Sequence, residues 1–167
     1  MPEFILDTSG AVQCDERTRF ENTKWRDLDA FTQGYIEALF FTSCAAGYAM
    51  QTVRASLAAY ESMIEDGGTV PEDAGFADLA PEALATILQD CQSFKLACVH
   101  VQPLMGEGDM PDEAQAGRDF WYTRNGHGCG FWDGDWPEPW ADDLDKAAKA
   151  FGEVDAYLGD DGKVYVS

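Results

Sequence analysis

Apolar residues recur at three- and four-residue steps in the first hundred positions, and this spacing constrains the fold more than any other feature of the chain. It predicts a first core helix from position 27 to about Gly47, with Asp27 or Asp29 as the N-cap, because a short carboxylate can accept a hydrogen bond from the first helical turn. The buried face of this helix would carry Leu28, Phe31, Tyr35, Ile36, Leu39 and Phe40.

The same spacing predicts two further helices. One would cover positions 50–64 and stop at Gly67-Gly68; it would pack on its own domain or pair with a partner helix. Its stripe is Met50, Val53, Leu57, Tyr60 and Ile64. The other would begin at Pro81, whose fixed φ suits a first turn, with Glu82 placed well for the helix dipole. Its stripe is Leu84, Ile87, Leu88, Cys91, Phe94 and Cys98.

The last third of the chain predicts strands and turns instead. Asn125-Gly126 is a strong hairpin signal, since both residues tolerate positive φ, and it would join a strand at 118–124 to one at 127–133. In that register Phe120, Tyr122, Cys129 and Phe131 would share the face that packs on the first helix.

A short helix is then predicted from Leu144 to Phe151, followed by a second hairpin. This hairpin would join 154–158 to 163–166 through Asp161-Gly162, so that Asp160 faces Lys163.

Together these elements predict an α+β domain that spans 1–167, in which an N-terminal helical layer packs on a small antiparallel sheet of three to four strands with one inserted helix. Its parts would be an irregular N-terminal arm at 1–25, a mainly helical part at 27–105, and a hairpin–helix–hairpin at 118–167.

The charge balance is the other outlying feature. The chain has 31 Asp and Glu against 11 Lys and Arg, a formal net charge of −20. Nucleic acids and anionic membranes would repel such a surface, whereas a basic protein would be attracted to it. The alternative is an acidic surface that serves only solubility.

The cysteines and the absence of targeting segments indicate a compartment. Five widely spaced cysteines without a C-x-x-C pair predict reduced thiols, and the start of the chain lacks the basic and apolar regions of a signal peptide. No apolar run approaches the ~18 residues that span a bilayer. A cytoplasmic protein without a metal or cofactor is therefore predicted.

Two segments of the C-terminal third carry a resemblance. They are DFWYTRNGHGCGFWD at 119–133 and AAKAFGEVDAYLGDDGKVY at 147–165; GYIEAL at 34–39 and LAPEAL at 79–84 are similar to landmarks earlier in the same family. In these segments the chain resembles a family of small uncharacterised proteins encoded by bacteriophages and prophages. The resemblance implies a phage or mobile element in the cytoplasm of a bacterial host, and it implies no activity.

The segment between Trp132 and Asp145 is the most suggestive for function. Two prolines stiffen it, and from Asp133 onward it contains six carboxylates and no basic residue. Tryptophan beside carboxylates on a constrained loop suits a basic partner, because the rings supply apolar area and the charges supply orientation. The predicted partner-binding residues are Asp133, Asp135, Trp136, Glu138, Trp140, Asp142, Asp143 and Asp145. The alternative is that some rings cap the core and the carboxylates are merely solvated.

Catalysis is the rival hypothesis. Arg124 and His127 flank the predicted turn, and with Asp133 they form the only visible candidate cluster for a small hydrolase-like enzyme. A phage housekeeping role is a third alternative. The leading hypothesis is an acidic binding protein that inhibits a basic host protein, such as a restriction or CRISPR complex, by mimicking DNA; the chain could also pair with a second copy of itself.

Overall fold

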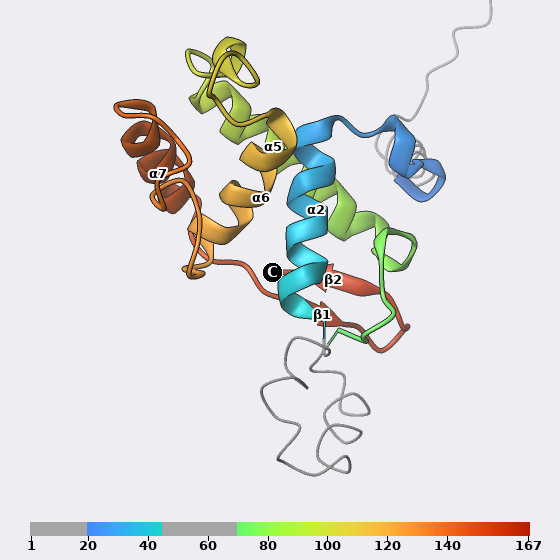
Figure 1. The fold of residues 1–167 in the computed structure, drawn as a ribbon. Coiled ribbons are helices and arrows are strands. Elements are labelled where there is room, and N and C mark those ends of the chain that lie inside the picture. Colours follow the sequence, from blue (N-terminus) through green and yellow to red (C-terminus); the bar gives the residue numbers. More distant parts are fainter. Residues whose placement is uncertain (1–19, 45–69) are drawn as a thin grey trace, which may run out of the picture.

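The computed structural model describes residues 20–44 and 70–167. This part of the chain includes the helices α2 (Ala30–Ser43), α5 (Pro81–Ala97), α6 (Glu113–Arg124) and α7 (Trp140–Ala150), and a hairpin of β1 (Ala156–Leu158) and β2 (Val164–Val166). In Figure 1, α2 and α6 lie side by side, α7 lies on the far side of α6 from α2, and the hairpin lies at the C-terminal end of α2. The fold is a mixture of helices and antiparallel strands, as predicted in outline.

The predicted first and third helices are confirmed. The Asp29 carboxylate caps α2 by accepting a hydrogen bond from the Thr32 N–H at 2.7 Å. Pro81 is the first residue of α5. The buried residues of the α5 stripe are Leu84, Ile87, Cys91, Phe94 and Cys98. The helix predicted from Leu144 is also present, but α7 begins four residues earlier, at Trp140.

Two glycines allow α2 and α6 to approach closely. A Cβ atom on Gly34 would overlap the carbonyl oxygen of Ala114, and one on Gly117 would overlap the carbonyl oxygen of Phe31. These neighbours are backbone atoms, which a side-chain rotation cannot move away. The crossing therefore depends on the missing side chains.

Aromatic rings fill the space between α2, α5 and α6. Phe94 of α5 stacks on Phe120 of α6 with centroids 4.2 Å apart, and its ring also lies 5.7 Å from Phe131. From α2, Phe31 and Tyr35 contact Phe120 at 6.1 and 5.3 Å. The predicted contact between Phe120 and the first helix is thus confirmed, although Phe120 lies on a helix and not on a strand.

The hairpin predicted around Asn125-Gly126 is wrong. Residues 118–124 belong to α6, whose N-cap Asp112 accepts from the Gln115 N–H at 2.8 Å. Gly126 has φ +65°; its N–H donates to the Thr123 carbonyl at 3.3 Å, and the next N–H, that of His127, donates to the Tyr122 carbonyl at 3.0 Å. These two bonds form a Schellman motif, so the positive φ that Asn-Gly favours ends a helix here instead of reversing a strand.

The second hairpin is present with a different register. Tyr157 pairs with Tyr165 and Leu158 with Val164, which places Gly159, and not Asp160, opposite Lys163. The loop therefore has three residues, and its last, Gly162, has φ +77°. Among the described residues the sheet has two strands, and the three to four that the sequence predicted are not found.

Several predictions lie outside the described residues. These are the helix at 50–64 and nearly all of the N-terminal arm. Within 20–44 and 70–167, no helix is long and apolar enough to cross a membrane.

Candidate partner-binding surface

The acidic loop, defined as residues 132–139, is the second half of the connection between α6 and α7, and it is anchored on both sides of its exposed tip. Phe131, just before the loop, is fully buried, and its N–H donates to the Thr123 hydroxyl at 3.0 Å. Trp136 is 3 % exposed and its ring lies 5.4 Å from that of Phe131. The two buried rings hold residues 132–135 on the surface.

A buried carboxylate on α6 supports the same anchor. Asp119 is 2 % exposed; its Oδ2 accepts from the Trp136 indole N–H at 2.7 Å and its Oδ1 from the Gln115 amide at 3.0 Å. Burial raises the pKa of Asp119 to about 6, against the two hydrogen bonds, which lower it. Trp136 therefore belongs to the core, and its predicted role as an exposed anchor is corrected.

The exposed tryptophan of the loop is Trp132, at 54 %. Beside it in sequence, Asp133 accepts a hydrogen bond from the Gly130 N–H at 3.2 Å. Asp135 and Glu138 are exposed, and neither makes a hydrogen bond or ion pair to another described residue. A half-exposed ring and three carboxylates thus occupy a short, anchored segment. Trp132 was not among the predicted binding residues, because residue type alone does not show which of the three tryptophan rings is buried.

The carboxylates of α7 have internal partners. Asp143 lies 3.3 Å from the His100 ring nitrogen, and His100 in turn lies 5.9 Å from the half-buried Trp140 ring. Asp142 lies 3.8 Å from Lys146, and Asp145 lies 2.7 Å from Lys149. The other oxygen of Asp145 is buried without a hydrogen-bond partner among the described residues. The Asp145 carboxylate is therefore less available to bind a partner than its place in the sequence suggests.

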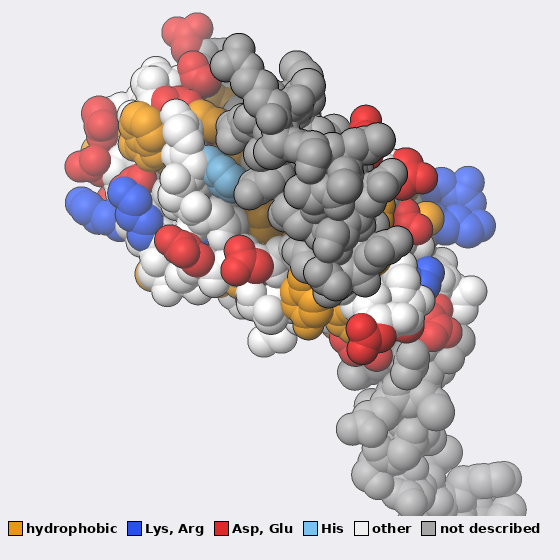
Figure 2. Space-filling model, turned by 90° about the horizontal axis from the view of Figure 1, so that it is seen from below, with side chains coloured by type: hydrophobic (Ala, Val, Ile, Leu, Met, Phe, Trp, Pro, Cys, Tyr) orange, Lys and Arg blue, Asp and Glu red, His pale blue; other side chains and the backbone are white. Residues whose placement is uncertain are grey.

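Basic side chains elsewhere are also neutralised within the chain. Arg118 pairs with Glu37 at 3.0 Å, and Lys95 pairs with Asp29. Figure 2 shows carboxylates scattered over one face, with lysine and arginine in a few small groups. Because many of the described cations are paired, exposed carboxylates such as Asp135 and Glu138 carry part of the excess negative charge.

Arg124, the first of the three candidate catalytic residues, is a buried structural residue. Its side chain is 2 % exposed and lies 2.7 Å from Asp90. The guanidinium also donates to the Tyr35 hydroxyl at 3.0 Å and to the carbonyls of Gly152 and Phe151 at 2.9 and 3.3 Å. These partners leave no accessible donor for a substrate.

His127 and Asp133 lie elsewhere. His127 lines a cavity of about 250 Å³ with Asn125, Glu153 and Asp155, and partial burial lowers the pKa of its imidazole. Asp133 is in the acidic loop. Within the described residues, no hydrogen bond joins any two of Arg124, His127 and Asp133, so the cluster that the hairpin would have assembled is not formed.

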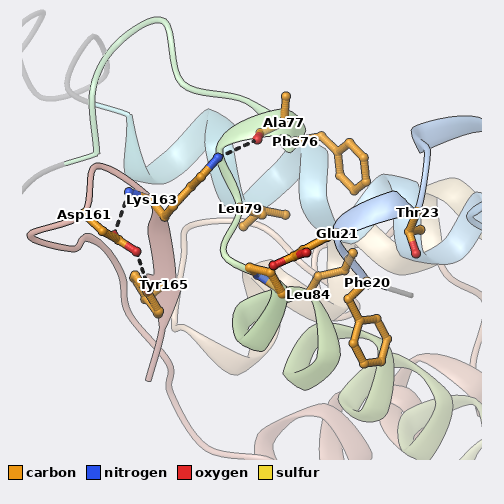
Figure 3. A pocket seen from close by; sticks show the side chains of 11 residues that line it. Phe20, Glu21, Thr23, Phe76, Ala77, Leu79, Leu84, Asp161, Lys163 and Tyr165 are labelled. Carbon is orange, nitrogen blue, oxygen red and sulfur yellow. Dashed lines mark hydrogen bonds between the residues drawn. The ribbon is translucent and has the colours of Figure 1, made fainter. Parts of the chain in front are cut away.

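A larger cavity, of about 410 Å³, lies where β2 meets the start of α5. Figure 3 shows that its polar groups at the hairpin are directed at neighbouring protein atoms: Asp161 accepts from the Tyr165 hydroxyl at 2.7 Å and from the Lys163 N–H at 3.0 Å, and the Lys163 ammonium lies 3.5 Å from the Ala77 carbonyl oxygen. The hydrogen bond from the Lys163 N–H is the main cause that lowers the pKa of the Asp161 carboxyl. Leu79 and Leu84 supply apolar lining. Nothing in this arrangement selects a ligand, so the acidic loop stays the stronger candidate.

Within 20–44 and 70–167, no group of three or more His, Cys, Asp or Glu side chains is arranged to hold a metal ion. Cys44, Cys91, Cys98 and Cys129 are free thiols. Burial raises the pKa of Cys98 to about 11 and that of Cys91 further, which disfavours the reactive thiolate.

Comparison with known proteins gives no match: no family model, no curated protein and no solved structure is significantly similar to this chain. The resemblance to phage proteins stays a hypothesis.

Proposed function

We propose that this chain is an acidic binding protein, of a phage or related mobile element, that inhibits a basic host protein by occupying its nucleic-acid-binding surface. The contact would be made by the acidic loop, with Trp132 as the apolar anchor and Asp133, Asp135 and Glu138 as the orienting charges. The α7 carboxylates Asp142 and Asp143 would lie at the rim.

The half-exposed Trp132 ring is the observation that carries this proposal. Exposed tryptophan is costly in water and is enriched at the centre of protein interfaces. Here the ring lies on a segment that Phe131 and Trp136 anchor in the core, so little conformational entropy is lost when a partner binds. The adjacent carboxylates attract basic surfaces and disfavour acidic ones.

The net charge of −20 supports the proposal that the partner has a basic surface. Long-range attraction between this protein and a basic surface would speed association and would weaken as salt rises, because the Debye length falls to ~8 Å at physiological ionic strength. A protein that normally binds DNA or RNA presents such a surface.

The test begins with capture of a partner from bacterial lysate at low salt and continues with binding kinetics of the purified pair. The triple variant Asp133→Asn/Asp135→Asn/Glu138→Gln should slow association and reduce its salt dependence. Trp132→Ala should speed dissociation by ~30-fold, which corresponds to about 2 kcal/mol. DNA should compete with the protein for the partner.

Charge-matched and ring-matched controls make the test specific. Glu72→Gln/Asp73→Asn/Glu113→Gln removes the same charge from exposed sites outside the loop, and Tyr157→Ala removes an exposed ring from β1. Both controls should leave the kinetics close to those of the wild type. Equal losses in the loop triple and the control triple, or a Trp132→Ala variant with unchanged dissociation, would contradict the proposal.

A further inference from the structure

We infer that Asp119 is a positioning residue for the partner-binding surface: its buried carboxylate holds the acidic loop through the Trp136 indole, and the ionisation state of that carboxylate sets how firmly the loop is held. This inference rests on the proposed function only in assigning a role to the loop. The tether itself is a property of the described residues.

The geometry of the tether is specific. Asp119 lies on α6, a helix packed against α2, and its two oxygens accept from two different elements: Gln115, one turn earlier on α6, and Trp136 in the loop. Gln115 is itself fixed, because its Oε1 accepts from Arg118 at 3.2 Å. Trp136 thus has one rigid acceptor, and the exposed segment 132–135 lies between Trp136 and the buried Phe131.

The charges around Asp119 do not neutralise it. Among the described residues, no lysine or arginine bonds to its carboxylate. Asp133 and Asp135, from the loop, face it with like charge. The other titratable groups around it are Tyr122, from α6, and Cys129, from the α6–α7 connection. Arg118 reaches Asp119 only through Gln115 and is otherwise paired with Glu37.

The direction of the pH effect follows from linkage. In the closed state the carboxyl is buried and its pKa is about 6; in an open state that admits water it returns towards 3.8. The state with the higher pKa binds more protons, so the closed state is favoured as pH falls and loses its advantage as pH rises through about 6. A difference of about two pH units corresponds to a change of up to ~100-fold in the ratio of closed to open loop.

Hydrogen exchange of the Trp136 indole N–H, followed by NMR, tests the tether without any partner. After correction for the intrinsic pH dependence of exchange, protection in the wild type should fall by up to ~30-fold between pH 4.5 and 7.5, because Asp119 in the open state is already mostly ionised at pH 4.5. Asp119→Asn is uncharged throughout and should abolish this dependence. Asp135→Asn, which removes an exposed neighbouring charge, should keep most of it. Wild-type-like pH dependence in Asp119→Asn, or a flat profile in the wild type, would overturn the inference.

A second measurement does not depend on the Asn variant. Trp136→Phe keeps an aromatic ring at this position but deletes the N–H donor that lowers the pKa of Asp119, so a ¹³C titration of the Asp119 carboxyl should show a higher pKa in this variant than in the wild type. An unchanged pKa would refute the tether.

The functional arm uses poly-L-lysine as a basic probe. The dissociation rate of poly-L-lysine from the wild type should vary with pH, and this variation should be absent in Asp119→Asn. If the loop is the contact, Trp132→Ala should speed the dissociation of poly-L-lysine. If poly-L-lysine binding ignores Trp132 while the indole remains pH-dependent, the proposed function fails and positioning of the loop by Asp119 stands.

Discussion

Replacement of Arg124 by methionine should remove many of the polar contacts that hold α6 to the rest of the molecule. The guanidinium is the shared donor for Asp90, the Tyr35 hydroxyl and two backbone carbonyls, and it lies 5.3 Å from the Phe120 ring. Methionine fills a similar volume but donates no hydrogen bond. The variant therefore separates the loss of the charge and its donors from the loss of packing.

The magnitude follows from what remains unpaired. A charge-assisted bond to Asp90 contributes about 1.5–3 kcal/mol, and three neutral acceptors lose about 1 kcal/mol each. Relief of the buried guanidinium's desolvation offsets part of this sum. Asp90 is a quarter exposed and can recover water. We expect Arg124→Met to lower the free energy of unfolding by ~3–5 kcal/mol, a large part of the ~5–15 kcal/mol typical of a domain.

Urea unfolding followed by circular dichroism gives the free energies for a double-mutant cycle with Asp90→Asn. The combined loss should be smaller than the sum of the two single losses by at least ~1 kcal/mol, because both variants break the same pair. Lys163→Met, at an exposed site on the second hairpin, is the control and should change stability by less than ~0.5 kcal/mol. A cost below ~1 kcal/mol for Arg124→Met, or an additive cycle, would refute a structural role and return Arg124 to the list of functional candidates.

Three further outcomes are expected. Gly117→Ala should destabilise by ~3 kcal/mol or more in thermal unfolding, since its methyl group would meet the Phe31 backbone, whereas Gly128→Ala, which meets nothing, should be near neutral. Phe131→Ala should cost ~3–5 kcal/mol in urea, and a loss under ~1 kcal/mol would remove that ring from the core. Because the folded-state pKa of Asp119 is raised to about 6, its contribution to stability is complete below pH ~4 and falls as pH rises through 6; the decline from pH 4.5 to 7.5 should be greater in the wild type than in Asp119→Asn, by at most ~2 kcal/mol.

Sequence alone predicted the elements whose signals are local and redundant. For α2 and α5, the apolar spacing agrees with the start signals, which are the N-cap Asp29 in one and Pro81 at the first helical position in the other, so both helices were found close to their observed starts. The hairpin of β1 and β2 was also found, and its register was missed by one position because a three-residue loop with Gly162 at positive φ competes with the two-residue turn.

The incorrect prediction of a hairpin at 118–133 has a different cause. Asn-Gly reports that the backbone turns through positive φ, and it does not report whether a strand or a helix comes before it. The aromatic residues of 120–122 favour a strand by propensity, yet Phe120 packs against Tyr35 and Phe94, and Trp121 packs against Tyr35; these tertiary contacts decide the outcome. The helix signal lay upstream, in the Asp112 cap and the run of helix-forming residues after it.

The candidate site was predicted only in part, because tertiary contacts also decide which of its side chains are exposed. Charge and aromatic content located the acidic loop, but the assignment of Trp136 as an anchor failed because its indole N–H has a buried acceptor, Asp119, seventeen positions earlier. A hydrogen bond between residues so far apart in sequence depends on how α6 ends, and the sequence pattern had predicted a strand in place of the C-terminal half of α6.

The positions of the two buried charges of α6 bear on the hypothesis of a resemblance to phage proteins. Asp119 and Arg124 lie within the segment 119–133 that carries the resemblance, and one holds the acidic loop while the other holds the chain that follows α7, at Phe151 and Gly152. Most of the other large residues of that segment's helical part are buried as well. Similarity in such buried residues preserves the fold but has little influence on which partner is bound. The specificity of binding would then lie in the exposed positions that packing leaves free, Trp132, Asp135 and Glu138 first among them, so exchange of these three between otherwise similar proteins should change the partner and leave the free energy of unfolding within ~1 kcal/mol.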